Sequence, residues 1–500
     1  MVDESTQVAE TTVDALRQAK VVAVQNRGIG YWIIATAALV MLAEQSAFGF
    51  TLYSPVLGSI AVQYQTSNVV WVMTTVMLAG AVAVPFLCKL ADVYGKKRIL
   101  GGGVVATALG CLLCAVAPSF GVLLAGRVLM AAGSAFAVIA VALMRDVFPP
   151  RMRSLAIALA LNGSGIVLIV GPLLSGWLVG IWGVGAPFVF QLVICLVSGA
   201  IALAIIPETP LRVLARVDYL GAALLGCGVF GILIGLSQVQ NRGWDQFTVG
   251  FTTIGLLALA VWTLQSKRSS DPLVNLRLIS RHAVATPVAA SALFYGVTAS
   301  VNVLVVLQWS TPKDVAPYGH SLNALQIGLW TIPFGILTVV AGIVVGLTVR
   351  SIGYRTHMII AGVCWTVPSV FLAFNLDASP AVAIAVYGIY GIATMSIAAA
   401  SSLILIATPE DQRSVALGMN ASVNSIAGAV VQVLIFAILG SSVAAVVAGS
   451  PVYTPEAFQA AYLTAAAVGA LGLIVSLLIP HGRRQPRSEP PTSDPQSDSP

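Results

Sequence analysis

Long apolar stretches alternate with short polar connections along the whole chain. Each stretch holds about 20 or more mostly apolar residues, the length that a helix needs to cross the hydrocarbon core of a bilayer. Their number and spacing predict an all-α polytopic membrane protein with fourteen transmembrane helices, grouped as six, two and six. The stretches lie near residues 31–54, 68–88, 99–117, 120–144, 155–179, 186–206, 218–238, 247–265, 284–309, 324–347, 357–375, 380–406, 413–440 and 459–480.

This grouping divides the chain into five regions. We expect a cytoplasmic N-terminal tail, a six-helix bundle, two extra linker helices with cytoplasmic loops, a second six-helix bundle and a disordered cytoplasmic tail. The last region is rich in Pro, Ser and Asp and has almost nothing apolar to bury. In the same order, the regions cover residues 1–30, 31–206, 207–283, 284–480 and 481–500.

The basic residues test both the number of spans and their orientation. Cytoplasmic loops of membrane proteins carry an excess of Lys and Arg. With both termini cytoplasmic, all but three of the 25 Lys and Arg residues fall in the tails or the inner loops. Arg242 and Lys313 fall outside, and Arg127 lies within a span. One missed or invented span in the middle of the chain would disrupt this segregation.

The composition argues against a soluble protein. Hydrophobic residues make up 58% of the chain and charged residues 9%, against roughly 25% charged residues in an average soluble protein. The net charge of +6 comes from small separate clusters, with no continuous basic face, which argues against a nucleic-acid partner. The six cysteines lie in or beside apolar stretches, where packing is the expected role.

The sequence contains no pattern typical of an enzyme. It lacks the G-x-x-x-x-G-K-[ST] sequence that an ATP-driven pump needs. Its four histidines lie in or near predicted loops and far apart in the sequence, so they indicate neither a metal cluster nor a nucleophile–base pair. We therefore expect neither an enzyme nor a protein with a bound cofactor or metal.

Two predicted inner loops resemble each other. Residues 88–98 follow the second span, and residues 346–355 follow the tenth. In each loop a glycine, Gly95 or Gly353, is followed two positions later by a basic residue. This repeat suggests two related halves, a plan common among secondary transporters, and alternating access suits it better than a channel does.

Four segments carry a resemblance to a known family. Residues 88–98 are similar to the pattern G-x-L-a-D-r-x-G-r-k, and residues 127–133 resemble the fourth-helix motif R-x-x-q-G. Residues 171–176 resemble the fifth-helix motif G-P-x-x-G-G, and residues 216–221 resemble the entry to a seventh helix. Over about residues 31–480, the chain is therefore similar to the major facilitator superfamily, and within it to the fourteen-span drug:proton antiporter branch.

The resemblance implies a conformational latch in the first of the repeated loops. Gly95 permits a tight turn there, and Asp92 can meet a helix N-terminus or an arginine of the opposite half, which would hold the inner side closed. The alternative is a plain basic loop that only fixes the topology. The candidate latch residues are Asp92, Gly95, Lys96, Lys97 and Arg98.

The resemblance also implies the direction of transport. Gly171, Pro172, Ser175 and Gly176 form the antiporter motif of the fifth span. In the family this motif is associated with export rather than import. The residues themselves indicate a packing seam, because small side chains allow helices to approach closely and Pro172 bends its helix.

Two ionisable residues, Glu44 and Arg127, lie well inside the predicted spans. Such residues are costly in a bilayer and usually functional. An acid can load and release a proton if it alternates between an apolar environment, which favours the protonated form, and a nearby guanidinium, which favours the charged form. We expect Glu44 to couple transport to protons with Arg127 as its partner. A counter-ion for a cationic substrate and a structural ion pair are the alternatives.

Further polar and aromatic residues are candidates for lining an apolar substrate cavity. For each polar candidate, hydrogen bonding between packed helices is the alternative role. The candidates are Gln45, Asn162, Gln191, Asn302, Gln326, Asn420, Asn424, Tyr295 and Trp330.

The expected function is proton-coupled antiport that exports small, lipophilic, drug-like compounds, cations among them. We expect a monomer that crosses the cell membrane many times and has lipid, a small-molecule substrate and protons as its partners. An importer of a metabolite, coupled to protons or to another solute, is one alternative. A transporter-derived membrane sensor is another, although such proteins often carry large soluble domains and the predicted tails are short.

Overall fold

The fold is almost entirely helical. The computed structural model describes residues 27–66, 68–209, 218–242, 245–269, 281–408, 413–447 and 450–480. In those ranges one antiparallel pair of short strands is the only sheet. The predicted all-α architecture is therefore confirmed, with this hairpin as an addition.

The first half of the molecule consists of helices, several of which join end to end. Gly95 separates α5 from α6 in a conformation with a φ of +113°, which favours glycine. The elements are α2 (Ile29–Ala43), α3 (Gln45–Thr51), η1 (Ser54–Val56), α4 (Leu57–Tyr64), α5 (Trp71–Tyr94), α6 (Lys96–Ala115), α7 (Phe120–Met130), η2 (Ala131–Ala135), α8 (Phe136–Val147), α9 (Pro150–Asn162), α10 (Ser164–Trp182) and α11 (Ala186–Ile205).

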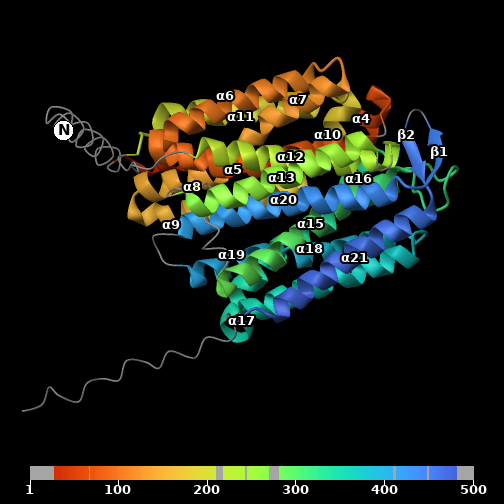
Figure 1. Cartoon of the computed structure of the whole chain (residues 1–500). Coiled ribbons are helices and arrows are strands. Elements are labelled where there is room, and N and C mark those ends of the chain that lie inside the picture. The colour runs from red at the N-terminus through yellow and green to blue at the C-terminus, as the bar shows by residue number, and fades with distance from the viewer. Residues whose placement is uncertain are drawn as a thin grey trace, which may run out of the picture.

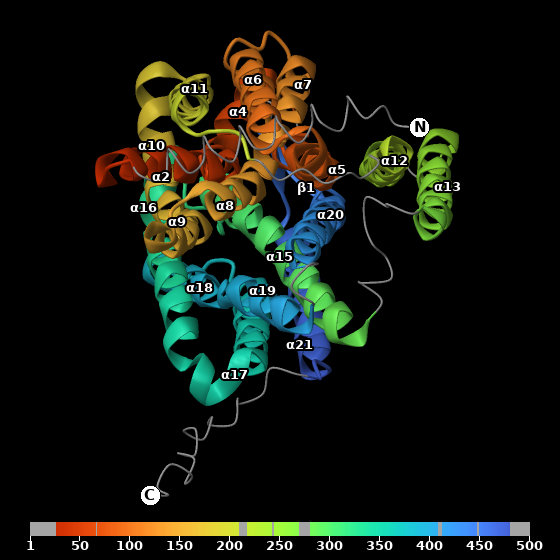
Figure 2. The ribbon, with the colours of Figure 1, turned by 90° about the vertical axis from the view of Figure 1, so that its left-hand side faces the viewer.

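Two further helices, α12 (Tyr219–Arg242) and α13 (Gln246–Arg268), form a separate pair at the edge of the molecule (Figure 2). Asp218 accepts a hydrogen bond from Gln265 Nε2 at 2.8 Å, which ties the start of α12 to the end of α13. A methyl group on Gly255 would lie 2.5 Å from the α12 backbone, so the two helices touch there. Because α12 also contacts α5 and α20, the pair lies beside the junction of the two halves.

The second half repeats the helical plan and carries the hairpin. Within α17, Gly353 has a φ of 78° and divides the long helix into two antiparallel arms. The elements are α15 (His282–Ser310), α16 (Ala324–Trp330), α17 (Ile332–Phe374), α18 (Pro380–Ala393), α19 (Met395–Ala407), α20 (Arg413–Leu439), β1 (Val443–Val447), β2 (Ser450–Tyr453) and α21 (Pro455–Leu477).

Most of the predicted spans appear as long apolar helices. Among the described residues, 12 helices are long and apolar enough to cross a membrane, and the bent pair Ile29–Ala43 and Gln45–Tyr64 raises the number to 13. The predicted seventh span corresponds to α12, whose described apolar part, Tyr219–Ile232, is shorter than a span. The first span is also longer than predicted, since its helix continues past residue 54 to Tyr64.

Several spans are interrupted between their ends. Glu44 separates α2 from α3 with a bend of 45°, and Gly163 separates α9 from α10. Thr331 and Thr394 mark two breaks in the second half, and each side chain donates a hydrogen bond to the carbonyl oxygen three residues earlier, at 2.8 and 2.6 Å. Such back-bonding competes with the helical pattern and bends helices.

The two halves lie one above the other in Figure 1, with the hairpin at one end of the bundle. We call this end the hairpin side, and the end that carries residues 88–98 the latch side. Between the halves, α5 packs against α20 and α10 packs against α16. Near the hairpin side, Thr74 Oγ1 donates to Gln432 Oε1 at 2.9 Å and so joins α5 to α20.

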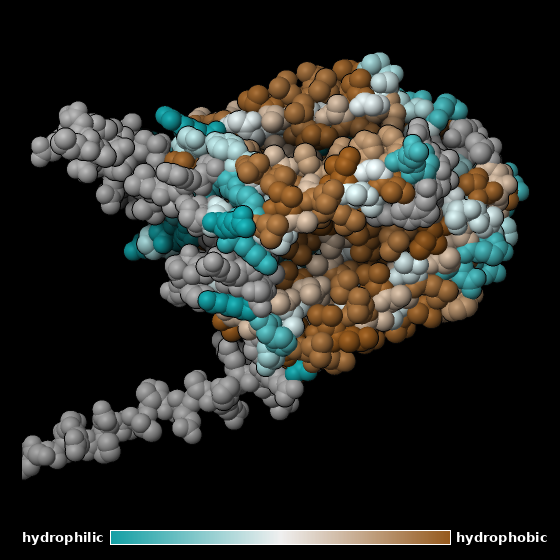
Figure 3. Space-filling model, viewed as in Figure 1, coloured by the Kyte–Doolittle hydropathy of each residue, from teal (hydrophilic) through white to brown (hydrophobic). Residues whose placement is uncertain are grey.

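The surface of the bundle matches a bilayer. Figure 3 shows hydrophobic residues over the middle of the visible face and hydrophilic residues at its two ends. The linker helix α13 adds much of this hydrophobic surface. Only 11% of its apolar segment is buried inside the protein, and Ile254, Leu257 and Leu264 are exposed. A broad exposed apolar belt of this kind is what lipid covers in a membrane protein.

Candidate functional site

Glu44 occupies the break between α2 and α3 inside the first half. Its side chain is buried, with 4% of the residue exposed. A methyl group on Gly163 would lie 2.6 Å from Glu44 Oε1, so the carboxylate fills the space that a larger side chain would need. Gly163 itself lies between α9 and α10. The carboxylate of one interrupted span therefore packs against the interruption of another.

Arg127 is held by backbone oxygens and by an aromatic ring. Its Nε donates to Val72 O at 2.8 Å and its Nη2 donates to Gly49 O at 2.9 Å. The guanidinium carbon lies 4.5 Å from the centroid of the Tyr53 ring, which is a cation–π distance. Since Val72 is in α5 and Gly49 in α3, this one side chain, 1% exposed, joins three spans.

The structure does not bring Glu44 and Arg127 into direct contact. Among the described residues, the guanidinium donates to the two carbonyls, lies over the Tyr53 ring and approaches the sulfur atoms of Met73 and Met130. Glu44 precedes the contacted Gly49 by five residues, which is about 7.5 Å along a helix axis. The hydrogen bonds of Arg127 therefore lie beyond the bend at Glu44.

A chain of buried hydrogen bonds connects the two regions. Gln191 Nε2 donates to Gln45 Oε1 at 3.2 Å, and Tyr53 OH donates to Gln191 Oε1 at 2.6 Å. Gln45 adjoins Glu44, and the Tyr53 ring lies over Arg127, so the chain spans the distance between the charges. The sequence pattern missed Tyr53, because it lies at the end of the predicted span, where tyrosine is common at a membrane interface. The continuation of the helix to Tyr64 places it in the interior.

The antiporter motif in α10 packs against both halves. Ser175 Oγ donates a hydrogen bond to Leu52 O of the first span. On the other face, a methyl group on Gly176 would lie 2.5 Å from Leu325 Cα of α16, and one on Gly328 would lie 2.8 Å from Pro172 O. These glycines allow α10 and α16 to approach backbone to backbone near the hairpin side. The predicted packing seam is therefore present and joins the two halves.

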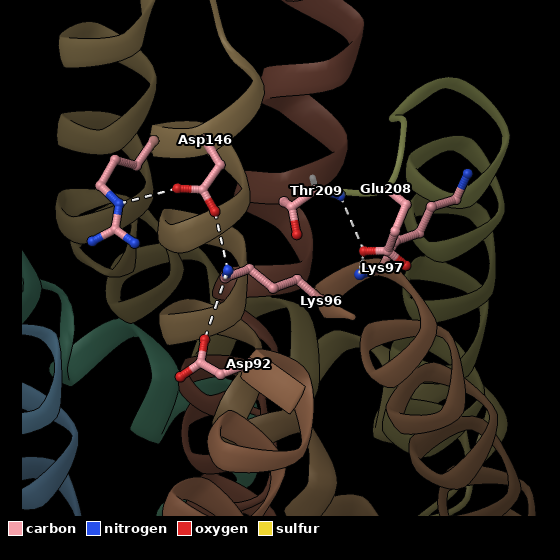
Figure 4. Close-up of polar contacts among 7 residues, drawn as sticks. Asp92, Lys96, Lys97, Asp146, Glu208 and Thr209 are labelled. Carbon is pink, nitrogen blue, oxygen red and sulfur yellow. Dashed lines mark hydrogen bonds and ion pairs between the residues drawn. The ribbon is translucent and has the colours of Figure 1, made fainter. Parts of the chain in front are cut away.

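Lys96 is the centre of an ionic cluster in the latch loop (Figure 4). Its Nζ lies 3.0 Å from Asp146 Oδ2 and 3.7 Å from Asp92 Oδ1. The side chains of Lys96 and Asp146 are buried, whereas 46% of the Asp92 side chain is exposed. Arg145 adds a contact of 3.2 Å to the other oxygen of Asp146. The cluster ties the end of α5 to the end of α8 within the first half.

Glu208 caps the helix that follows the latch turn. Its Oε1 accepts a hydrogen bond from Lys97 N at 3.0 Å, and its Oε2 accepts one from Arg98 N at 3.2 Å. A methyl group on Gly95 would lie 2.9 Å from this carboxylate, so the turn requires glycine for space as well as for φ. A carboxylate satisfies the free N–H groups of a helix N-terminus and its dipole. A helix N-terminus was one of the two contacts that the sequence offered for Asp92, and at this helix Glu208 makes it.

The second repeated loop keeps the backbone of the first and changes its chemistry. Gly353 has a φ of 78° and a ψ of 158°, against 113° and 132° for Gly95. In place of the acidic cluster, His357 Nδ1 lies 2.8 Å from Gly353 O and His357 Nε2 lies 2.8 Å from Thr348 Oγ1. Arg355 Nη2 donates to Leu477 O. The two loops therefore share the glycine turn, whereas the side-chain contacts around the turn differ.

The remaining candidates for lining a substrate cavity lie in different parts of the second half and make different kinds of contact, apart from Asn162 in the first half. Asn302 accepts a hydrogen bond from Tyr387 OH at 2.6 Å, which links α15 to α18. Gln326 completes a capping box with Asn323 at the start of α16. Tyr295 packs against Gly428 of α20, and Trp330 lies edge-on to Trp309 at 5.1 Å. The side chain of Asn162 lies outside the described part of the structure.

The described residues offer no cluster suited to a metal. Groups of three or more His, Cys, Asp or Glu side chains close enough to bind one ion are absent from those ranges. The buried polar groups instead bond to helix backbones and to one another. This is the chemistry of a helical bundle whose interior holds a few charges.

These features together define a polytopic α-helical membrane protein built from two halves. The chain belongs to the major facilitator superfamily, because the model of the Major Facilitator Superfamily matches residues 39–430. The members of this family are transporters.

Curated relatives are similar to parts of the chain. The Multidrug resistance protein B homolog of Mycobacterium tuberculosis (strain ATCC 25618 / H37Rv) is 33% identical over 228 residues, which cover 43% of this chain and 41% of that protein. The chain thus matches less than half of that relative's length. The Multidrug resistance protein Stp of the same strain is 26% identical over 383 residues, which cover 75% of this chain and 68% of that protein.

Solved structures share the fold at low sequence identity. A peptide transporter POT in complex with sulfate aligns with a TM-score of 0.64 and 16% identity, covering 93% of this chain and 97% of that one. The human organic anion transporter MFSD10 (TETRAN) aligns with a TM-score of 0.56 and 15% identity, covering 89% and 99%. These likenesses confirm the all-helical fold of the family.

Proposed function

We propose that the chain is a proton-coupled antiporter that exports small lipophilic compounds from the cell, cations among them. The observation that carries this proposal is the buried carboxylate of Glu44, which lies between two interrupted helices. The names of two relatives, Multidrug resistance protein B homolog and Multidrug resistance protein Stp, support multidrug efflux. An importer would use the same fold, so the direction of transport needs its own test.

The proposed topology has fourteen spans, grouped as six, two and six, with both termini cytoplasmic. Helix α12 supports the additional span, because its 24 residues would be about 36 Å long and the hydrocarbon core is about 30 Å thick. The basic residues on the latch side support a cytoplasmic location for that side. We propose the cell membrane as the location and retain the predicted division into five regions.

Proton coupling would depend on Glu44 and on the fixed charge of Arg127. Protonation of a buried carboxylate removes its charge, and release of the proton restores it, so the surroundings that the group prefers differ between the two forms. The interruptions at Glu44 and Gly163 are the points where two spans can change direction as the carboxylate changes charge. A proton that moves inward across the membrane supplies about 2.3 kcal/mol per 100 mV. Glu44 would thereby link the proton gradient to the arrangement of the helices.

The two sides of the transporter would then have separate closing devices. On the hairpin side, the seam formed by Gly176 and Pro172 with α16 brings the halves together. On the latch side, Asp92 is half exposed and bonded within its own loop, so it remains accessible to a partner in the second half. We propose that Asp92 contacts the second half when the latch side closes. Lys96 and Glu208 would maintain the conformation of the loop through their ion pairs and hydrogen bonds.

The experiment that tests this function uses inverted membrane vesicles from a host that lacks its own efflux pumps. After the vesicle lumen is acidified, the proposal predicts that ethidium, a lipophilic cation, accumulates inside. Adding ethidium should also partly collapse the preset pH gradient, as read by a pH-sensitive dye. Proton-driven loss of ethidium from the vesicles would contradict export. Accumulation that persists after an ionophore has removed the pH gradient and the membrane potential would contradict proton coupling.

A further inference from the structure

A cavity of about 550 Å³ opens at the hairpin side, apart from the buried charges. The N-terminal part of α4, with Gly58 and Ser59, lines it from the first half, and Ser310 and Ile327 line it from the second half. Tyr453 of β2 also lines it. Figure 1 shows α4, α16 and β2 together at this end of the bundle. Both halves and the hairpin therefore contribute to a single cavity.

The hairpin is attached firmly to the second half. Tyr318 OH donates a hydrogen bond to Tyr453 O, and Thr454 N donates one to Ser442 O at 3.0 Å. The rings of Tyr318 and Phe458 are in contact, with centroids 5.0 Å apart. From this anchored position β2 reaches across to contact α4 of the first half. The part of the cavity wall that the hairpin supplies is therefore held in place by hydrogen bonds and ring packing.

The lining has no charge and little free hydrogen-bonding capacity. Every described residue that lines the cavity is uncharged, and most are apolar. The hydroxyls of Ser310 and Thr311 already donate to Leu307 O, at 3.1 and 2.8 Å, and Asn323 is engaged in its capping box. Burial also raises the pKa of Tyr453 to about 12, so its hydroxyl stays neutral. A charged ligand would lose its hydration here without gaining a counter-ion.

The size and chemistry together select a class of ligand. Small-molecule sites have volumes of roughly 300–1,000 Å³, mostly apolar walls and a few polar groups that fix orientation. In this cavity Ser59 and Gln63, one helical turn apart on α4, supply such polar groups. We propose that the cavity is a binding site for an uncharged, largely apolar small molecule, and that its binding holds the two halves together on the hairpin side.

The second part of the proposal follows from the location of the walls. A ligand that contacts both halves loses contacts when they separate, so it binds the closed arrangement more tightly. A ligand shifts a conformational equilibrium by its difference in affinity for the two states. Occupancy of this site therefore favours the state that is closed on the hairpin side. This inference does not depend on proton coupling or on the direction of transport.

The test measures binding of tritiated progesterone, an uncharged steroid, to the full-length protein in lipid nanodiscs, with empty nanodiscs subtracted. Gly58→Leu fills the cavity, since a methyl group there already approaches Ser310 at 3.9 Å. Gly121→Leu is the matched control, because nothing lies within 4 Å of that position. We expect saturable binding that weakens at least tenfold in Gly58→Leu and is unchanged in Gly121→Leu. Ser59→Leu provides a second cavity variant if Gly58→Leu fails to fold.

Charge and conformation provide two further readouts. The carboxymethyl oxime of progesterone adds one carboxylate and should compete at least tenfold more weakly. Saturating progesterone should slow amide hydrogen exchange in residues 324–330, where α16 meets α10. Equal binding by Gly58→Leu and the wild type, or equal competition by the carboxylate, would overturn the assigned site. If saturating progesterone left amide hydrogen exchange in residues 324–330 unchanged, the proposal that the ligand holds the two halves together would be wrong.

Discussion

Arg127 and Glu44 are both buried charges in the first half, yet they are held in opposite ways. Arg127 is fixed by two carbonyl oxygens and a tyrosine ring, which come from two neighbouring spans. Glu44 lies at a bend of 45° and packs against a glycine at a second interruption. One charge ties three spans together, and the other lies at a break within its own span.

The difference separates a structural charge from one that can change state. A guanidinium keeps its proton at any physiological pH, so a fixed set of acceptors suits it. A carboxylate can bind and release a proton, and its preferred surroundings differ between the two forms. Interrupted helices can adjust around such a group at lower cost than continuous ones. We therefore assign the protonation step to Glu44, and to Arg127 a fixed charge that also stabilises the three spans it joins.

The largest expected effect comes from Arg127→Met. The variant loses two charge-assisted hydrogen bonds, each worth about 1.5–3 kcal/mol, and a cation–π contact. We expect folding stability to fall by about 3 kcal/mol, seen as a lower melting temperature of the purified protein. Arg127→Lys retains the charge without the planar fork and should fall in between. If Arg127→Met melted like the wild type, the structural role of this residue would be wrong.

An intermediate effect is expected from Gly163→Ala, which acts on the surroundings of Glu44. The new methyl group would lie 2.6 Å from the carboxylate and 3.0 Å from Leu159 O, so the carboxylate must move. We expect proton-driven ethidium transport to slow about tenfold, equivalent to about 1.4 kcal/mol, with a nearly normal melting temperature. Gly180→Ala in the same helix is the control, because nothing lies within 4 Å of that position. Equal transport by the two variants would contradict the importance of this contact.

The smallest effect is expected from Tyr53→Phe. This variant keeps the ring over Arg127 and removes only the hydroxyl that donates to Gln191 at 2.6 Å. Loss of one buried hydrogen bond should lower stability by about 1 kcal/mol. Tyr53→Leu removes the ring as well and should lower the melting temperature further. A drop in Tyr53→Phe as large as that in Arg127→Met would mean that the hydrogen-bond chain, and not the guanidinium, holds these spans.

The helices were predictable from the sequence because their apolar length and the charges between them are local signals. The first span was the main error in length, since Ser54 and Pro55 have the composition of a helix end. In the structure they form η1, and the helix resumes as α4 up to Tyr64. The contacts of Arg127 with a backbone carbonyl oxygen and with the Tyr53 ring in this first span leave no recognisable pattern in the sequence. For that reason Tyr53 was missed as the partner of Arg127.

The partners within the latch loop were hidden for a different reason. Gly95 and Lys96 were identified from the loop itself, whereas Asp146 and Glu208 lie about 50 and 110 residues further along. A single sequence does not indicate which distant acid reaches a given turn, although both acids lie at span ends. The hairpin at residues 443–453 was likewise unpredicted, because its pairing depends on packing against Tyr318 and α4.

We propose that Glu44 carries the coupled proton, and proton flux in a Glu44→Gln variant tests this role. Glu44→Gln removes the titratable group and preserves its size, and Glu456→Gln makes the same change at an exposed acid in the first turn of α21. Both variants are reconstituted into proteoliposomes, and proton flux evoked by ethidium is recorded with a pH-sensitive dye. We expect Glu44→Gln to abolish this flux while the protein stays folded, and Glu456→Gln to behave like the wild type. Normal ethidium-evoked proton flux in Glu44→Gln would contradict a proton-carrying role for Glu44.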